Sequence, residues 1–305
     1  MDKIKRVIVT VDLSEMDVNL LKYVTMLSNS IKLDKVYFLN VMESLELPEK
    51  ITEKYPDLVA PRDEATKSSI QYTIDDAVGD QLDVEYEITV AEGNPTEQIL
   101  KWAKIKEVDL IVMGRKSKSK GDGILTTKVI RLSPCSVALI PETFEKIKNI
   151  VVPIDFSEAS KLAFEYAINY ARVIKNVQIT CLNIYSVPNG YTISGKSFKE
   201  FASIMKNNAM ESLDELLKKY KTKGIQINTR VELNKKGNIA KKIYKVALRE
   251  NATSIVIGSK GRTNAAALIL GSIAEKLLKV DATIPVIVVK QRKHNLSFLE
   301  ALLNI

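Results

Sequence analysis

Histidine, cysteine and tryptophan are scarce in this chain of 305 residues, which has one histidine, two cysteines and one tryptophan. The single histidine, His294, lies in a polar C-terminal segment. The chain therefore has no material for a histidine-rich zinc site, a Ser-His-Asp triad or a Cys-His pair. Cys135 and Cys181 fall in or beside apolar runs that are expected to be buried strands. That placement predicts inert thiols in a reducing compartment rather than a disulfide framework.

Long apolar runs are also missing. No run approaches the roughly 20 residues that a membrane-spanning helix needs. The opening residues, MDKIKR, lead into a strand rather than into the apolar region of a signal peptide. We therefore expect a cytoplasmic protein with no membrane partner. The net charge of +8 suits nucleic acid, but the lysines are scattered and their densest cluster, RKSKSK at 115–120, has no interleaved aromatic residue. The composition argues against a nucleic-acid partner.

The two halves of the chain repeat each other. VIVTVDLSE at 7–15 matches IVVPIDFSE at 150–158, so that Asp12 and Asp155 are 143 positions apart. The offset stays at 143 for LNV at 39–41 against LNI at 182–184, and becomes 144 for Gly114 against Gly258. So constant an offset predicts one domain written twice. The first domain spans residues 1–142, the second spans 146–290, and a tail covers 291–305.

Each half alternates short β-branched runs with stretches of helical periodicity, which predicts βαβ units. Five strands are expected per half, near 5–11, 35–42, 84–90, 109–113 and 136–140, with counterparts about 143 to 149 residues later. Short, continuously apolar runs separated by helices are typical of parallel strands that are covered on both faces. The predicted fold class is therefore α/β, with two tandem Rossmann-like domains that each hold a five-stranded parallel sheet flanked by helices.

A glycine-rich segment lies between the strand expected at 254–257 and the helix expected at 274–280. It contains Gly258, Gly261 and the pair Gly271-Ser272. Glycines can adopt positive φ and bring backbone N–H groups close to an anion, and the N-terminal end of the next helix adds positive charge. The segment therefore predicts a phosphate-binding loop. The alternative interpretation is a mobile surface loop.

The corresponding segment of the first half is four residues shorter. Ser117 stands where the second glycine should be, and Ile124 stands where the second half has Ser272. A shorter loop with fewer glycines cannot aim its N–H groups along the same path, which predicts one nucleotide per chain. Arg115 and three neighbouring lysines leave open a weaker mode, in which an anion meets flexible point charges.

Both halves resemble universal stress protein domains. In the second half VPIDFS at 152–157, the turn at Gly237-Asn238, and GSKGRT at 258–263 with GSIAEK at 271–276 are similar to the ATP-binding subgroup of that family. The resemblance implies an adenine nucleotide alpha-hydrolase-like fold. It also implies that the two domains pair through their last strands as a pseudo-dimer within the chain. A further homodimer and an unknown protein partner stay open.

The resemblance further implies that ATP is the ligand, with Mg²⁺ as its companion. Asp155 and Ile184 would contact the nucleoside. The other site residues would surround the phosphates: Ile257, Gly258, Ser259, Lys260, Gly261, Arg262, Gly271, Ser272 and Ile273. Asp155 keeps two roles open, since it accepts from ribose hydroxyls or magnesium in one and caps a helix in the other. Ser272 likewise either donates to phosphate or caps its helix.

These features favour an ATP-binding stress-response or regulatory protein rather than an enzyme, although slow ATP hydrolysis stays open. Bound nucleotide can shift a population of conformations without any catalytic residue. The alternative is a nucleotide-free scaffold in which both domains are structural. An adenylating enzyme and a dinucleotide-binding oxidoreductase are excluded, because DFSE at 155–158 follows the first strand where a Gly-rich phosphate loop would be needed.

Overall fold

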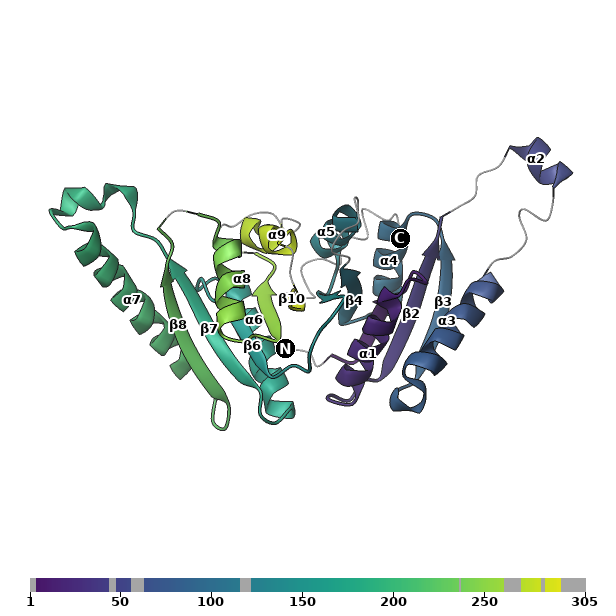
Figure 1. Cartoon of the computed structure of the whole chain (residues 1–305), viewed down its shortest axis with the longest axis horizontal. Coiled ribbons are helices and arrows are strands. Elements are labelled where there is room, and N and C mark those ends of the chain that lie inside the picture. Colours follow the sequence, from purple (N-terminus) through teal and green to yellow (C-terminus); the bar gives the residue numbers. More distant parts are fainter. Residues whose placement is uncertain are drawn as a thin grey trace. The chain divides into compact units, whose positions relative to one another are not determined.

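The computed structural model describes residues 4–43, 48–55, 63–115, 122–235, 237–260, 270–280 and 283–291. The chain divides into two compact units, Asp2–Thr143 and Phe144–Gln291, and each contains five strands that run parallel (Figure 1). The predicted parallel α/β fold is confirmed. The predicted C-terminal tail lies outside the described residues apart from its first residue, and the pairing of the last strands stays a prediction.

In the first unit the strand order is β3-β2-β1-β4-β5. The order reverses direction between β1 and β4, which pair with each other directly. Its strands are β1 Arg6–Thr10, β2 Lys35–Met42, β3 Tyr86–Glu92, β4 Leu110–Arg115 and β5 Ser136–Pro141. Its helices are α1 Met16–Ser28, α2 Glu49–Lys54, α3 Asp63–Ala77, the 3₁₀ turn η2 Gly79–Gln81, α4 Pro95–Ile105 and α5 Asp122–Leu132.

The second unit repeats this arrangement in the order β10-β9-β6-β7-β8, with the reversal between β6 and β9. Its strands are β6 Asn149–Pro153, β7 Gln178–Tyr185, β8 Gln226–Leu233, β9 Ser254–Gly258 and β10 Val286–Val289. Its helices are α6 Glu158–Val173, the 3₁₀ turn η3 Asn189–Ser194, α7 Phe198–Lys218, α8 Ile239–Arg249 and α9 Ser272–Leu278. In an open parallel sheet a ligand crevice forms at the carboxyl ends of the strands where the order reverses. The topology therefore directs attention to the ends of β6 and β9.

The core of each unit is made of the central strands and the inner faces of the helices. Ile8 on β1 and Val152 on β6 are fully buried. In the first unit α1 contacts α3 while α4 contacts α5, and in the second unit α8 contacts α9. The predicted element limits are wrong in small ways: β3 begins at Tyr86, and α9 begins at Ser272 and ends at Leu278.

The repeat extends to unusual backbone angles. The residues that follow the first strand of each unit, Leu13 and Phe156, have φ of 62° and 66°. Positive φ is uncommon for residues other than glycine and often marks a constrained functional turn. Asn94 and Asn238 occupy matching places as well, and each caps the helix that follows by accepting a backbone N–H bond. The two units therefore share local backbone structure, including a strained turn after the carboxyl end of the first strand.

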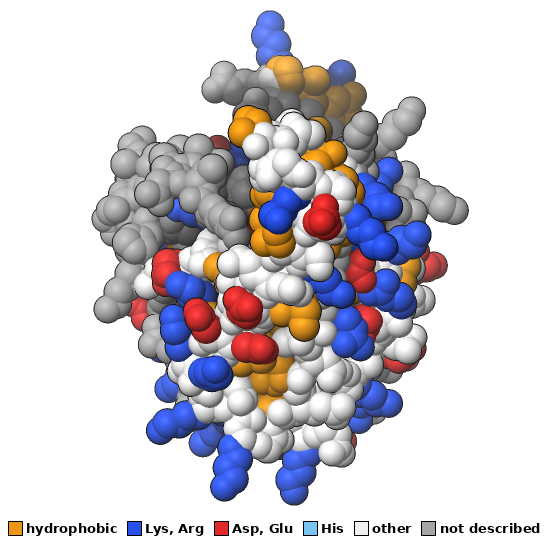
Figure 2. Space-filling model, turned by 90° about the vertical axis from the view of Figure 1, so that its left-hand side faces the viewer, with side chains coloured by type: hydrophobic (Ala, Val, Ile, Leu, Met, Phe, Trp, Pro, Cys, Tyr) orange, Lys and Arg blue, Asp and Glu red, His pale blue; other side chains and the backbone are white. Residues whose placement is uncertain are grey.

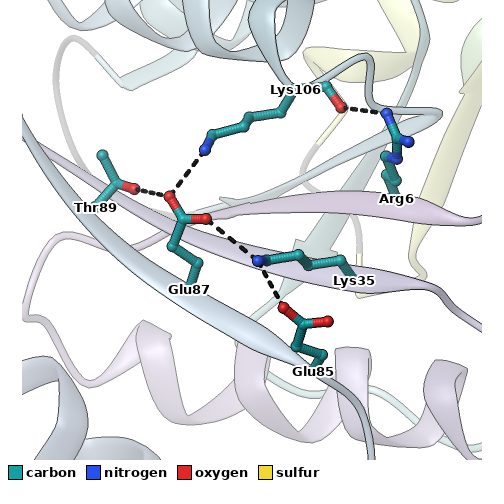
Figure 3. A network of polar contacts seen from close by, with 6 residues as sticks. All are labelled: Arg6, Lys35, Glu85, Glu87, Thr89 and Lys106. Atoms are coloured by element: carbon teal, nitrogen blue, oxygen red, sulfur yellow. Dashed lines mark hydrogen bonds and ion pairs between the residues drawn. The ribbon is translucent and has the colours of Figure 1, made fainter.

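A cluster of charged side chains lies at the opposite, amino end of β2 and β3 (Figure 3). Lys35 Nζ lies 2.7 Å from Glu85 Oε1 and 3.4 Å from Glu87 Oε2, and Lys106 Nζ lies 2.9 Å from Glu87 Oε1. The hydrogen bond from Lys106 is the largest cause of the lowered pKa of Glu87, and Lys35 contributes further. Each exposed pair of this kind stabilises a fold only slightly. The cluster ties the edge strand β3 to β2 and α4, far from the carboxyl ends of the strands.

Candidate functional site

Asp155 lies just beyond the end of β6, where its carboxylate is held by the first turn of α6. Its Oδ1 atom accepts hydrogen bonds from the backbone N of Ser157 at 3.1 Å and from Ser157 Oγ at 2.5 Å. Ser157 is the N-cap of α6, because its hydroxyl oxygen accepts from the backbone N of Ser160. The capping role left open for Asp155 is therefore filled by Ser157, and Asp155 is a partly exposed carboxylate with a fixed orientation.

Asn183 supports this turn from the neighbouring strand. Its side chain is 5% exposed, and its Nδ2 donates a 2.8 Å hydrogen bond to the carbonyl oxygen of Ile154. Asn40 does the same to Val11 in the first unit. Loss of the Asn183 amide would leave the buried carbonyl oxygen of Ile154 without this hydrogen bond, which is energetically costly. Asn183 therefore fixes the path of the backbone into Asp155. The sequence analysis missed this role, although an asparagine inside an otherwise apolar strand of both halves was its signal.

Gly258 ends β9 against the start of α6. A methyl group on its Cα would lie 2.5 Å from the carbonyl carbon of Ala159, a contact that no relaxed structure tolerates. The prediction that these glycines use positive φ is wrong for the two that are described: Gly258 does not lie in that region, and Gly271 has φ of −59°. Gly258 is required for close packing of a helix on a strand. Gly261 and Arg262 lie outside the described residues.

The two ends of the glycine-rich segment return to one place. The backbone N of Gly271 donates to the carbonyl oxygen of Ser259 at 2.8 Å, and the N of Ser259 donates to Val289 on β10. Gly271 is the N-cap of α9, and Ser272 is its first residue. Ser272 therefore does not cap the helix. Its exposed hydroxyl and the Lys260 ammonium make no hydrogen bond or ion pair with any described residue.

A cavity of about 580 Å³ opens over the carboxyl ends of β6, β7 and β9. This volume is in the range of small-molecule and cofactor pockets. Of the predicted site residues it is lined by Asp155, Ile184, Ile257, Gly258, Lys260, Gly271, Ser272 and Ile273. Ser259 does not line the cavity, and its contribution is the backbone bridge to Gly271. The geometry thus brings together residues from both ends of the second half of the chain.

The equivalent cavity of the first unit is about 170 Å³. Asp12, Val41 and Gly114 line it, as their counterparts do in the second unit, but Met16 stands where the second unit has Ala159. The side chain of Met16 lies over the strand end, since a methyl group on Gly114 would meet its Cγ at 2.6 Å. The loss of the first site stays a prediction, and Met16 adds a second feature in its favour besides the shorter loop, because its side chain occupies part of the crevice. The loop residues from 116 to 121 lie outside the described residues.

Comparison with known proteins agrees with the duplicated fold. The profile of the universal stress protein family matches residues 3–141 and, a second time, residues 146–290. The chain belongs to the universal stress protein family. Two universal stress proteins of Methanocaldococcus jannaschii, MJ0531 and MJ0577, are 31% and 28% identical to it. The alignments cover 48% of this chain in both cases, with 84% of MJ0531 and 96% of MJ0577.

Both units have the fold of solved universal stress proteins. The crystal structure of a universal stress protein from Archaeoglobus fulgidus covers 94% of this chain and 96% of its own, with a TM-score of 0.62. The identity between the two is 19%, so the likeness concerns the fold. No helix of the described segments is long and apolar enough to cross a membrane.

The cavity also contains residues that the sequence analysis did not identify. Met205, Asn208 and Ala209 of α7 line the cavity, and so do Ile239 and Ile243 of α8. Little in the sequence indicated that α7 belongs to the site, because only the fold shows that this helix packs against β7 and β8. The cavity therefore has an apolar end beneath α7 and a polar end beside α9.

Two titratable groups interact near the apolar end: Tyr185, which lines the cavity, and Glu232 on β8, which does not. Burial raises the pKa of Tyr185, and the negative charge of Glu232 raises it further, so the phenol keeps its proton at neutral pH. Burial opposes the ionisation of Glu232, but hydrogen bonds from Arg249 and Lys242 outweigh it and lower the pKa of this carboxyl. The Lys242 Nζ to Glu232 Oε2 distance is 2.9 Å. The charge of Glu232 is thus neutralised by neighbours outside the cavity.

Proposed function

We propose that the second domain binds one ATP, with Mg²⁺ as the nucleotide's companion, and that the protein is a nucleotide-responsive stress-response regulator. The observation that carries the proposal is the difference between the two equivalent crevices. The second is an open cavity of about 580 Å³, and the first is reduced to about 170 Å³ beneath Met16. A chain with one open and one filled crevice is suited to a single ligand.

The chemistry of the cavity suits a nucleoside phosphate. At one end an ammonium, Lys260, and a hydroxyl, Ser272, have no partner among the described residues, and both groups donate to phosphate oxygens. Asp155 lies at the middle strand, where its carboxylate can accept from ribose hydroxyls or join the coordination of Mg²⁺. The apolar end beneath α7 offers surfaces for a base.

Regulation rather than catalysis is proposed because the cavity offers few groups that could move a proton. Among the described residues that line it, the titratable side chains are Asp155, Tyr185 and Lys260. Among the described residues no group of three histidine, cysteine, aspartate or glutamate side chains could hold a metal ion. Burial raises the pKa of the Cys181 thiol to about 12, so it is a poor nucleophile. Binding alone shifts a conformational equilibrium when the ligand prefers one state.

The proposed setting is the cytoplasm, because two buried cysteines, Cys135 and Cys181, suit a reducing compartment. Pairing of the two domains within the chain, a homodimer and a protein partner that responds to the bound nucleotide remain part of the proposal. The alternative function is a nucleotide-free scaffold.

Calorimetric titration with ATP and Mg²⁺ is expected to give one site per chain. Gly271→Val is expected to weaken binding at least about tenfold, because a branched side chain would project from a residue that lines the cavity. The backbone of Gly271, with φ of −59° and ψ of 139°, is extended and accepts valine without strain, so the fold should persist.

Gly190→Val is the matched control. It places the same side chain on η3 of the same domain, away from the cavity, where a methyl group would meet only Ile193 Cδ1 at 3.7 Å. This variant should bind ATP as the natural chain does. Two sites per chain would refute the single-site proposal, and no heat of binding by the natural chain would favour the scaffold.

A further inference from the structure

The base end of the cavity can be located from the strand order. The groups proposed to bind phosphate lie beside the end of β9, Asp155 follows β6, and Ile184 is the residue before the last of β7. Neighbouring strands are about 4.8 Å apart, so β7 lies about 10 Å from β9 across the sheet. A nucleotide laid across the three strand ends therefore places its base beside Ile184, beneath α7. This step rests on the proposed function.

The walls at this end are mostly apolar, and α7 adds to the lining the side-chain amide of Asn208, a solvent-exposed residue. Ile184, Met205, Ala209, Ile239 and Ile243 form the apolar surface. The amide of Asn183 is engaged with Ile154. In contrast, Asn208 makes no hydrogen bond with any described residue.

We propose that Asn208 of α7 recognises the edge of the base and makes the site selective for adenine over guanine. An asparagine amide presents a donor and an acceptor side by side, which matches the N6 donor and N7 acceptor of adenine. Guanine offers two acceptors, O6 and N7, on the same edge, so one of them faces the amide oxygen. Its additional amino group would also need a partner that the isoleucine side chains do not supply. Met205 supplies a polarizable thioether for the face of the ring.

The helix that carries Asn208 is firmly anchored. A capping box starts α7: the N of Ser197 donates to Glu200 Oε2, and the N of Glu200 donates to Ser197 Oγ. Ala209 and Leu213 are buried on its inner face. Its outer face shows apolar side chains among charged ones (Figure 2), and Met210 there is 47% exposed. Asn208 lies on the margin between these faces, a fixed position suited to a selectivity residue.

In the described part of the first unit, no comparable amide from the equivalent helix lines the smaller cavity. Among the described residues that line its smaller cavity none belongs to α3, the helix that occupies the place of α7 in that unit. Of the two equivalent cavities, only the larger one in the second unit is lined by a described amide from this helix.

The test is a comparison of ATP and GTP dissociation constants, each with Mg²⁺, for the full chain and two variants. The natural chain should prefer ATP by about tenfold or more, the discrimination expected of one paired amide. Asn208→Ala should lose most of that preference while still binding nucleotide through its phosphates. Asn207→Ala is the matched control, since Asn207 is the preceding residue of α7 and does not line the cavity. It should keep the natural ratio.

The outcomes separate the two proposals. Equal affinity of the natural chain for ATP and GTP, or an unchanged ratio in Asn208→Ala, overturns the role of Asn208 and leaves nucleotide binding in place. A uniform loss for both nucleotides in Asn208→Ala assigns the residue a structural role and also overturns the inference. Failure of the natural chain to bind either nucleotide overturns the proposed function and this inference with it.

Discussion

Ala159→Met is expected to close the cavity of the second domain and weaken ATP binding by at least about 100-fold, the loss that roughly 3 kcal/mol of misfit produces. Position 159 corresponds to position 16, where methionine lies over the strand end of the first unit. At position 159 the same side chain would cover Gly258, which lines the cavity. Calorimetry with ATP and Mg²⁺ measures the loss, and the far-ultraviolet circular dichroism spectrum reports whether the fold is retained.

The control for Ala159→Met is a variant with a small side chain at position 159. Ala159→Ser adds one oxygen atom, leaves the strand end open and should bind ATP with nearly natural affinity. Because α6 packs more closely on Gly258 than α1 packs on Gly114, Ala159→Met also costs stability, about 1–3 kcal/mol for overpacking. Undiminished ATP binding by a folded Ala159→Met protein would contradict the expectation that a methionine at this position closes the crevice to nucleotide.

The reciprocal change separates two features in which the first crevice differs from the second. Met16→Ala would enlarge the smaller crevice but would not supply a hydroxyl at the start of α5, where Ile124 is 64% exposed. We therefore expect that Met16→Ala alone does not give the chain a second ATP site.

The sequence predicted what depends on pattern and spacing. Apolar runs and helical periodicity were enough for the order of strands and helices, and the offset between Asp12 and Asp155 was enough for the duplication. The loop pattern located the polar end of the cavity, because Gly258 and Gly271 follow a strand and precede a helix. These features are local in the chain.

Three features of the site were not predicted, because each depends on contacts between distant elements. The effect expected of Met16 requires the distance between α1 and the end of β4. The role proposed for Asn208 requires the path of α7 over β7. For Asn183 the sequence held a signal, a polar residue in an apolar strand, but its role requires the hydrogen bond to Ile154 beyond the neighbouring strand. The reason predicted for glycine at position 258 was also wrong. Glycine is needed there because a side chain would collide with α6, and not because the backbone has a positive φ.

The last of these corrections leads to a prediction about stability. Gly258→Ala is expected to lower the free energy of unfolding of the second domain by about 3 kcal/mol, since its Cβ would overlap the backbone of Ala159. Backbone atoms at the start of α6 cannot rotate away as a side chain can, so the helix must move off β9. For a domain of this size the melting temperature should fall by roughly 6–12 °C.

Gly114→Ala is the matched change in the first domain, and it should cost less than about 1 kcal/mol. There the added methyl group meets Met16 Cγ at 2.6 Å, and a flexible methionine can take another rotamer. Thermal unfolding gives the size of each effect, and hydrogen exchange of peptides from α6 and β9 against those from α1 and β4 assigns it to a domain. Equal destabilisation by the two substitutions would contradict the packing role of Gly258. A larger loss in Gly258→Ala would show that close packing of α6 requires glycine at this position, which also lines the cavity.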